Sequence, residues 1–529
     1  MMDAAPHGDL DRLPTELKCA VARFLTTLID RKALVLVSKT WADVVLPYLW
    51  ETLKTDLVNT GSRDIRLLAS TKSNILKHVR KMHILPRTTS SGEDHLPTLL
   101  AAVPRGQLCG FQSDRALAQS TVDILLRLHP NLVVFKLLTG SALANALASP
   151  WTEGCFTNLT SMIVYPNCFS RASLQKVWRE CPGLLDMQLL RHVNFGSAEL
   201  DEEDFIPSPD PHLLSATDHT PAAVVQHMDA LKLQCLSIRE VALPQTLDNM
   251  FQRIDALALQ ELKLDTFTGT SKLLEALASQ FTHGQPCLKK LHIVRLAEQA
   301  TEGVFASLLL LLTSFCGLQS FQLQCVNCDK VDVDGIINHG ETLESLLVVN
   351  GGIHREDKAR CYNASDLQKI ATACPQLQNL CLNLYEIDPN RYESDVLGLQ
   401  SDASHAPNAF EQALDVIATM SNLRFLRLTN PPNYRKAYSR PGVFVRWHTR
   451  EVQSGAERYA FRARADGLMQ YMGDRGSNLR LLSFSPTEDL EKAGQPDKHG
   501  HVWPTYLYTR VQAVDSQGVV VHFARPIAG

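Results

Sequence analysis

The sequence predicts an α/β protein in which a short helical module at the N-terminus precedes a long array of strand–helix repeats. Two observations predict this. Apolar residues follow helical spacing in the first fifty residues. The pattern apolar-x-x-apolar-x-apolar then recurs from about residue 75 to about residue 485. A single strand–helix unit cannot bury its apolar face, whereas stacked units can, so we expect the repeats to form one array.

Composition narrows the classes of function. The chain has 529 residues, 45% apolar and 20% charged, with a formal net charge of −4. This near-neutral balance makes nucleic acid an unexpected partner. The most apolar run, residues 304–315, is shorter than the 18 or so residues that a membrane span needs, so we expect no membrane partner. Thirteen cysteines without a secretion signal indicate a reducing compartment, the cytoplasm or the nucleus.

Residues 10–55 form the expected helical module, after a disordered stretch at residues 1–9. One helix carries an apolar face at offsets 0, 3, 4, 7, 8 and 11 from its first leucine. Asp30 and Ser38 are positioned to cap two further helices. The residues of that first apolar face are Leu17, Ala20, Val21, Phe24, Leu25 and Leu28. A domain this small usually depends on a larger one, so a plain helical cap on the repeats is the alternative interpretation.

The order of residues in this module resembles a known family. Leu-Pro-x-Glu-Leu at residues 13–17 is followed by Asp-x-x-x-Leu at 30–34, Val-Ser-x-x-Trp at 37–41 and Leu-Pro-x-Leu-Trp at 46–50. This series resembles the F-box, which binds a Skp-type adaptor and through it a cullin. The resemblance implies adaptor contacts or internal core, two sets that the sequence does not separate, at Leu13, Pro14, Leu17, Leu25, Leu34, Val37, Ser38, Trp41, Pro47 and Trp50. Val21 departs from the isoleucine that the family often has.

The repeats are expected to occupy residues 56–500. Successive pattern starts at residues 132, 159, 184, 233, 259, 288, 318 and 343 are separated by 27, 25, 49, 26, 29, 30 and 25 residues. Most intervals are near the 20–29 residues of a leucine-rich repeat. The interval of 49 represents either one unit with an insertion or two units of which one is unreadable. Between the strands, apolar residues at offsets 0, 3, 4 and 7 predict helices, for example Leu274, Leu277, Ala278 and Phe281.

Cys-Pro-x-Leu-x-x-Leu-x-Leu at Cys181 and Cys374 resembles the cysteine-containing class of leucine-rich repeats, which often follows an F-box. The resemblance implies a solenoid with parallel strands on the concave face, where partners usually bind, and helices on the convex face. After residue 348 the periods become irregular, so the register of the last units stays open.

Three segments interrupt the repeats, near residues 196–225, 388–409 and 431–470. The first is acidic and rich in proline, which predicts a mobile loop, either regulatory or merely solvated. Within the third, aromatic residues are interleaved with basic ones, a combination that can bind nucleic acid or an acidic or phosphorylated peptide. The candidate target-binding residues there are Arg435, Lys436, Arg440, Arg446, Trp447 and Arg450. The alternative, which we favour, is that this segment has no binding role. It would then form a strand around residues 443–447 and a helix around 456–472, with solvated arginines. Residues 501–529 are expected to form a hairpin that caps the array.

We find no sequence pattern that indicates a catalytic, metal-binding or cofactor-binding site. Cys325-x-x-Cys328 has no second ligand pair at zinc-binding spacing. Cys181 and Cys374 lie on apolar helical faces, which predicts buried core residues. The combined expectation is a non-catalytic substrate-recognition subunit of a Skp–cullin–F-box ubiquitin ligase that binds an unknown target protein. The alternative is an F-box and repeat scaffold that acts outside degradation, and a more distant one is an enzyme built on the solenoid.

Overall fold

The structure is a computed structural model that describes most of the two regions predicted from the sequence. The described residues are 9–25, 27–55, 67–70, 75–85, 95–115, 117–137, 140–149, 152, 155–164, 181, 183–190, 198–199, 230–239, 241–242, 254–265, 269–296, 303–326, 330–351, 361–384, 407, 409–428, 455–484 and 507–527. They belong to two compact units, residues 1–255 and residues 256–529. Both units are α/β, with mostly parallel strands connected through helices.

The first unit begins with the expected helical module. Its elements are a 3₁₀ turn η1 (Asp9–Arg12) and the helices α1 (Thr15–Phe24), α2 (Leu28–Val35) and α3 (Lys39–Leu49). Thr27 caps α2 by accepting the Asp30 N–H at 3.1 Å, and Ser38 caps α3 by accepting the Trp41 N–H at 3.4 Å. Asp30, which we expected as a cap, is therefore inside the first turn of α2, where its carboxylate is favoured by the helix dipole.

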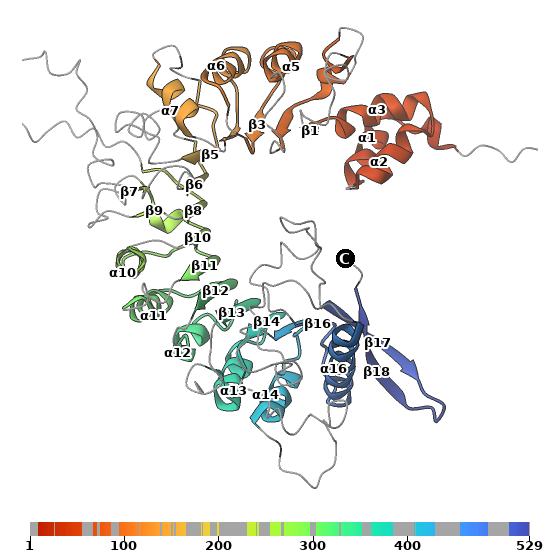
Figure 1. The fold of residues 1–529 in the computed structure, drawn as a ribbon, viewed down its shortest axis with the longest axis vertical. Coiled ribbons are helices and arrows are strands. Elements are labelled where there is room, and N and C mark those ends of the chain that lie inside the picture. The colour runs from red at the N-terminus through yellow and green to blue at the C-terminus, as the bar shows by residue number, and fades with distance from the viewer. Residues whose placement is uncertain are drawn as a thin grey trace, which may run out of the picture. The chain divides into compact units, whose positions relative to one another are not determined.

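A parallel sheet follows the module in the first unit. Its strands, in spatial and sequence order, are β1 (Thr52–Thr55), β2 (Lys81–Ile84), β3 (Gly110–Ser113), β4 (Val134–Leu137), β5 (Ser161–Val164), β6 (Asp186–Leu190) and β8 (Cys235–Arg239). The connecting helical elements are η2 (Leu76–His78), α5 (Leu96–Ala102), α6 (Gln119–Leu128) and α7 (Gly140–Ala148). Helices α5, α6 and α7 lie along one face of the sheet (Figure 1). A separate parallel pair joins β7 (Ala198–Glu199) and β9 (Val241–Ala242).

Pairing of β6 with β8 resolves the interval of 49 residues. Met187 lies opposite Leu236 and Leu189 opposite Ile238, so two pattern starts belong to neighbouring strands. The interval is therefore one unit with an insertion. By contrast, β1 was not predicted, because Thr55 takes the third apolar position of its pattern and is nevertheless buried. The sheet thus begins at residue 52, inside the segment 10–55 that we expected to be helical.

The second unit continues the same construction. Its parallel strands are β10 (Glu261–Asp265), β11 (Lys290–Leu296), β12 (Ser320–Val326), β13 (Ser345–Gly351), β14 (Asn379–Leu382), β15 (Phe425–Leu428) and β16 (Leu481–Phe484). The helical elements are η6 (Ala256–Ala258), α10 (Thr270–Thr282), α11 (Val304–Ser314), α12 (Val333–Ile337), α13 (Ala364–Ala373), α14 (Ala409–Ala418) and α16 (Gly455–Asp474). The predicted helical face of α10 is buried, which confirms the 3.6-residue period there.

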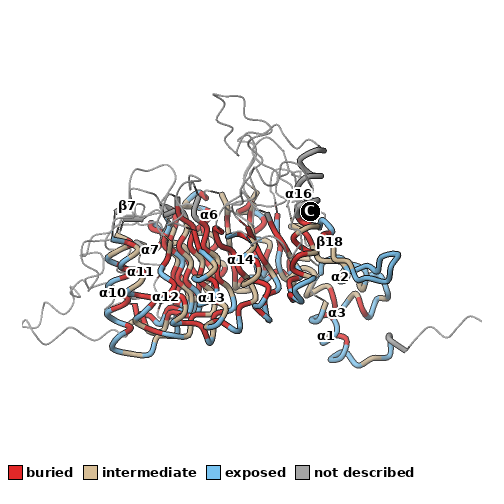
Figure 2. The backbone as a smooth tube through the Cα atoms, turned by 90° about the horizontal axis from the view of Figure 1, so that it is seen from below, coloured by how far each residue is buried: buried red, intermediate tan, exposed pale blue. Residues whose placement is uncertain are grey.

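Neighbouring parallel strands are held in register by one recurring hydrogen-bond arrangement. The carbonyl oxygen of the residue before a strand accepts the N–H groups of two consecutive residues at the start of the next strand. Glu51 does so with Arg80 and Lys81, both at 2.9 Å, and Arg424 does so with Arg480 and Leu481, both at 2.8 Å. Where this shared carbonyl occurs, it aligns the pattern leucines of the two strands, so their side chains stack into a core within each unit. Figure 2 shows buried residues recurring along the repeats.

The predicted C-terminal hairpin is confirmed. Strands β17 (Leu507–Val514) and β18 (Val520–Pro526) pair antiparallel, and β17 pairs antiparallel with β16. Helix α16 covers the outer edge of β18, because Asp466 Oδ1 accepts the Ala524 N–H at 2.6 Å and Gln470 Oε1 accepts the His522 N–H at 2.5 Å. Such cover removes the unpaired N–H groups that make an exposed edge prone to aggregation.

The buried polar groups include two histidines that serve as structural acceptors. His129 Nδ1 accepts the Leu108 N–H at 3.5 Å and His339 Nδ1 accepts the Leu318 N–H at 3.4 Å. Both rings are at most 2% exposed. Burial lowers the pKa of His339 to about 4. Cys181 and Cys374 are buried as predicted, and burial raises the pKa of the Cys374 thiol to about 11. Among the described residues, no helix combines the length and apolar character that crossing a membrane requires.

Gly340 provides a test of close packing between neighbouring repeats. A Cβ at this position would overlap the backbone carbonyl of Ala373, at the end of α13. Because backbone atoms cannot rotate away, we expect Gly340→Ala to lower the free energy of unfolding by roughly 1–3 kcal/mol in urea titrations. Gly183→Ala, whose Cβ would make only ordinary contacts at 3.8 and 3.9 Å, is the control and should be near neutral. Equal effects of the two changes would contradict the packing argument.

The lowered pKa of the buried His339 predicts that the folded protein loses stability in acid. Its folded pKa of about 4 lies below the ordinary histidine pKa of 6.5, so the unfolded state binds more protons between these values. The stabilisation is complete above pH 6.5 and is lost as the pH falls toward 4, by on the order of 3 kcal/mol. We expect His339→Gln, which keeps an acceptor but does not titrate, to flatten the fall in melting temperature between pH 7 and pH 4.5. The exposed control His283→Gln should leave that fall unchanged.

Candidate functional site

The inner side of the helical module forms a small core of its own. Trp41 is 2% exposed and packs with Ala22 of α1 and Val45 of α3, both fully buried. Partly buried hydrophobic residues around this cluster are Leu13, Leu34, Val35, Val44 and Tyr48. Three of the residues that the resemblance singled out, Leu13, Leu34 and Trp41, therefore belong to the internal core and hold α1–α3 together.

A polar network joins the start of α1 to the start of α3. Lys18 is only 5% exposed, and its Nζ donates to the Asp11 carbonyl at 2.8 Å and to Thr40 Oγ1 at 3.2 Å. The Asp11 carboxylate accepts from the Ser38 hydroxyl at 2.6 Å and the Thr40 hydroxyl at 3.1 Å. The hydrogen bond from Ser38 contributes most to lowering the pKa of Asp11. The buried side of α1 thus uses a lysine and an alanine rather than the predicted apolar residues.

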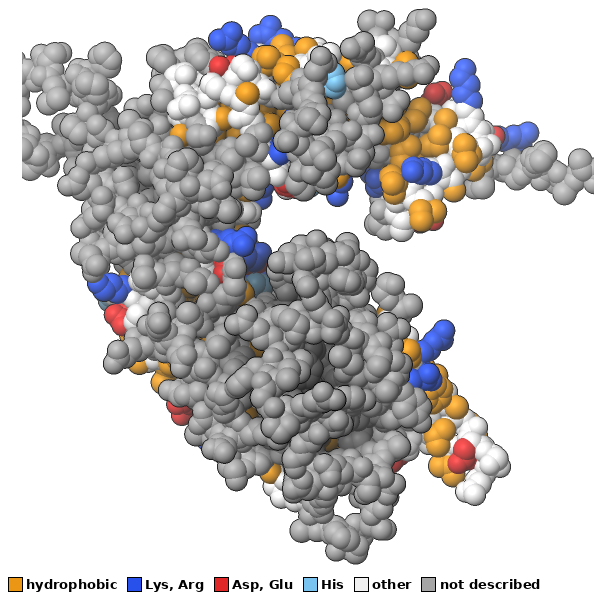
Figure 3. Space-filling view, viewed as in Figure 1, with side chains coloured by type: hydrophobic (Ala, Val, Ile, Leu, Met, Phe, Trp, Pro, Cys, Tyr) orange, Lys and Arg blue, Asp and Glu red, His pale blue; other side chains and the backbone are white. Residues whose placement is uncertain are grey.

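The predicted apolar face of α1 points outward. Leu17 is 52% exposed, Val21 39% and Phe24 86%, and the stripe continues at Leu28, which is 55% exposed. Ile29 near the start of α2 and the pair Leu36–Val37 after its end are exposed as well, at 79%, 85% and 57%. We call these seven side chains the docking face: Leu17, Val21, Phe24, Leu28, Ile29, Leu36 and Val37. Figure 3 shows hydrophobic side chains gathered over the helices that Figure 1 labels α1–α3.

Of the remaining residues that the resemblance singled out, one is exposed and the others lie at the end of a helix or inside one. Pro14 is exposed at the N-cap of α1. Leu25 ends α1 and its carbonyl accepts from Arg31 Nε at 2.7 Å. Pro47 is inside α3, and the half-buried Trp50 ends that helix by donating its N–H to the Leu46 carbonyl at 3.0 Å. Of the ten, only Leu17 and Val37 are large hydrophobic residues on the docking face.

Sequence reasoning missed Phe24, Leu28, Ile29 and Leu36 as surface residues. The helical period had placed Phe24 and Leu28 on one apolar face, and such a face normally packs against the same domain. The signal that could have found them is the pair Lys18 and Ala22 on the opposite side of α1. The candidate target-binding residues Arg435, Lys436, Arg440, Arg446, Trp447 and Arg450 lie outside the described residues, and so does most of the acidic segment 196–225.

The described residues contain no group of three or more His, Cys, Asp or Glu side chains placed to hold a metal ion. Cys325 is buried and its thiol donates to the Val349 carbonyl at 3.7 Å, which fits a structural role. Comparison with known proteins adds no identity, since no protein-family model matches the chain and a search of curated proteins finds no significant relative.

The two sides of the module should respond differently to mutation. Trp41→Ala removes the centre of the core, and we expect a loss of roughly 3–5 kcal/mol in module stability. Phe24→Ala removes an exposed ring, and we expect a change within about 0.5 kcal/mol. Hydrogen exchange followed by mass spectrometry on peptides from α1 and α3 measures this difference. Faster exchange after Phe24→Ala than after Trp41→Ala would show that the orientation of α1 is wrong.

Proposed function

We propose that this chain is the substrate-recognition subunit of a Skp–cullin–F-box ubiquitin ligase. The docking face binds the Skp-type adaptor, and the repeats, as a leucine-rich-repeat solenoid, bind a target protein. The mechanism is proximity, because a bound target has its lysines held near ubiquitin carried by another subunit, which raises the effective concentration of the reacting groups. The chain itself supplies no acid–base chemistry in this proposal.

The observation that supports the adaptor half most is the concentration of exposed hydrophobic side chains. Fourteen large hydrophobic residues are exposed among the described residues, and seven of them lie between Leu17 and Val37. Scattered exposed hydrophobic residues need no explanation, but a gathered set indicates an interaction site. Burying one such side chain completely contributes about 1.5–3 kcal/mol. Phe24, Ile29 and Leu36 are more than three-quarters exposed and have the most to gain.

The alternative interpretation, a plain helical cap on the repeats, fits this geometry less well. A cap would be expected to turn the apolar stripe of α1 toward the first strand–helix units. That stripe is exposed instead, and the module connects to the sheet through the backbone at Glu51, whose carbonyl holds the start of β2.

The strand face opposite the helices supports the target-binding half. In the first unit, Lys54, His83, Gln112 and Lys136 occupy neighbouring positions across β1–β4 and are exposed or half-buried. His83 Nε2 lies 2.6 Å from Asp114 Oδ2, and Lys136 Nζ lies 3.0 Å from Asp186 Oδ2. A row of polar and charged groups of both signs offers complementary contacts to a protein partner.

Copurification with a Skp-type adaptor tests the proposal. We expect the full chain to retain the adaptor and the triple variant Phe24→Ala/Leu36→Ala/Val37→Ala to lose it, because three exposed anchors are removed while the core stays intact. The matched control is Val514→Ala/Val519→Ala/Val520→Ala, which removes three exposed hydrophobic residues from the C-terminal hairpin. It should bind the adaptor normally. Failure of the folded wild-type chain to bind would refute the adaptor role.

Ubiquitylation of a captured target distinguishes degradation from a scaffold role. If the chain acts in the ligase, a target modified in the presence of the wild type is unmodified with the triple variant although it remains bound. A target that binds the adaptor-loaded chain and is never modified would instead favour a scaffold that acts outside degradation.

A further inference from the structure

Two neighbouring repeats of the second unit carry the same short sequence. Ser421-Asn422-Leu423-Arg424 precedes β15, and Ser477-Asn478-Leu479-Arg480 precedes β16. The leucines are buried as part of the core, whereas both asparagines and both arginines are exposed. Packing accounts for the leucines but not for the repeated exposed residues.

The shared carbonyl arrangement stacks these two segments directly. Arg480 donates its backbone N–H to the Arg424 carbonyl, and Phe425 lies opposite Leu481, so the two arginines occupy equivalent positions on adjacent strands. Adjacent strands are about 4.8 Å apart, which brings the two side chains within reach of one ligand. Arg510 of β17 is next in this row, since its backbone N–H donates to the Arg480 carbonyl at 2.8 Å.

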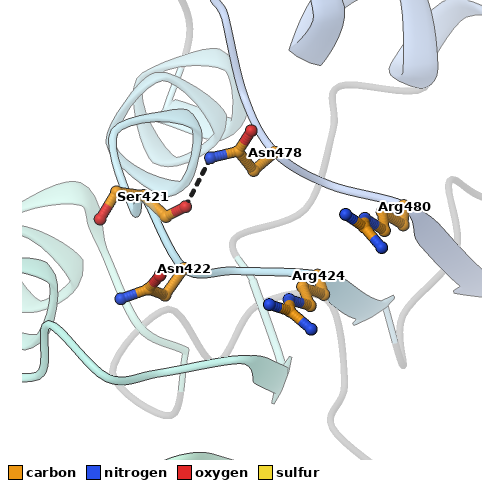
Figure 4. A pocket seen from close by; sticks show the side chains of 5 residues that line it. All are labelled: Ser421, Asn422, Arg424, Asn478 and Arg480. Atoms are coloured by element: carbon orange, nitrogen blue, oxygen red, sulfur yellow. Dashed lines mark hydrogen bonds between the residues drawn. The ribbon is translucent and has the colours of Figure 1, made fainter.

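The asparagines fix the turns from which the arginines project. Asn422 Nδ2 donates to the Pro375 carbonyl at 2.8 Å, and Asn478 Nδ2 donates to the Ser421 carbonyl at 2.7 Å. Figure 4 shows this second bond and the two guanidinium groups at the starts of their strands. Each asparagine therefore ties its own turn to the preceding one, which orders the backbone that presents Arg424 and Arg480.

Among the described residues, no carboxylate pairs with the side chains of Arg424 and Arg480. Within the described part of the chain, neither Arg424 nor Arg480 forms a hydrogen bond or an ion pair through its side chain. Gln378, the residue before Arg424 in the row, is uncharged. Burial and the charge of Arg480 lower the pKa of Arg510, whose Nη1 donates to the Ser477 carbonyl at 2.6 Å. Like charges on adjacent strands destabilise a sheet unless an anion joins them.

A pocket of about 170 Å³ lies between the two segments and is lined by Ser421, Asn422, Arg424, Asn478 and Arg480. Clefts for drug-sized ligands enclose roughly 300–1,000 Å³, so this one suits a single side chain. Its lining is mostly polar groups and two guanidinium forks, and such forks match the oxygens of a phosphate. A phosphoryl group carries about −1.5 to −2 charges, which two arginines neutralise.

We propose that Arg424 and Arg480, with Arg510 beside them, bind one phosphorylated serine or threonine side chain of a protein partner. Nucleic acid fits less well, because the site provides a single short row rather than a track along many phosphates. The inference rests on the proposed function for the view that the partner is a target protein. The site itself is tested without the adaptor, so failure of one proposal is distinguishable from failure of the other.

The probe is a fluorescein-labelled pool of nonapeptides with a central phosphoserine and randomised flanks, and the reference is the same pool with serine. Fluorescence anisotropy with the full chain should give an affinity for the phosphoserine pool that is tighter by roughly tenfold or more. Arg424→Gln/Arg480→Gln should lower it to the level of the serine pool. Arg480→Lys keeps the charge but loses the fork, and it should give an intermediate affinity.

Arg105→Gln, which removes an exposed arginine of the first unit, is the matched control and should leave phosphopeptide binding unchanged. Circular dichroism confirms that each variant folds, and the Phe24→Ala/Leu36→Ala/Val37→Ala variant should bind the phosphoserine pool like the wild type. Equal affinity for the two pools, or undiminished binding by the double glutamine variant, would overturn the proposal. Tighter binding of a single-stranded RNA through the same two arginines would also overturn it, in favour of a nucleic-acid site.

Discussion

The structure depends on the carbonyl group that precedes each parallel strand. By accepting two consecutive N–H groups of the next strand, this oxygen fixes the register of every pair that it joins. A slip of one residue would turn the pattern leucines away from the core, so register and burial reinforce each other. The same constraint places the residues that precede neighbouring strands side by side. Arg424 and Arg480 thus become neighbours although they are 56 positions apart in sequence.

The N-terminal module illustrates why an amphipathic helix does not reveal its own orientation. Helix α1 has two usable faces, because Ala22 can pack closely against Trp41 and the long stem of Lys18 can be buried while its ammonium finds oxygen partners. The larger apolar face is then exposed. The module's own core is small, so it buries little apolar surface for its length.

Much of the repeat fold was predictable from sequence, because leucines at fixed spacing report both the strand and its buried side. The strands that the pattern does not reveal share one feature, a polar residue at a buried position. At β1 and β3 the third apolar position is taken by Thr55 and Ser113, which are buried all the same. The hydroxyl of Ser113 donates to the Arg115 carbonyl at 2.9 Å, so a polar side chain satisfies its hydrogen bond locally and occupies a core position.

By itself the sequence determined the α/β class, the repeat period, the helical module and the C-terminal hairpin, because each depends on local spacing and on turn residues. It also supplied the resemblance on which the proposed adaptor role is based. Only the tertiary structure decided which residues of the module are core and which form the docking face, and that β6 and β8 are neighbours across a long insertion. It alone brought two arginines of different repeats into one pocket. Orientation and proximity depend on contacts between distant segments, which no local pattern encodes.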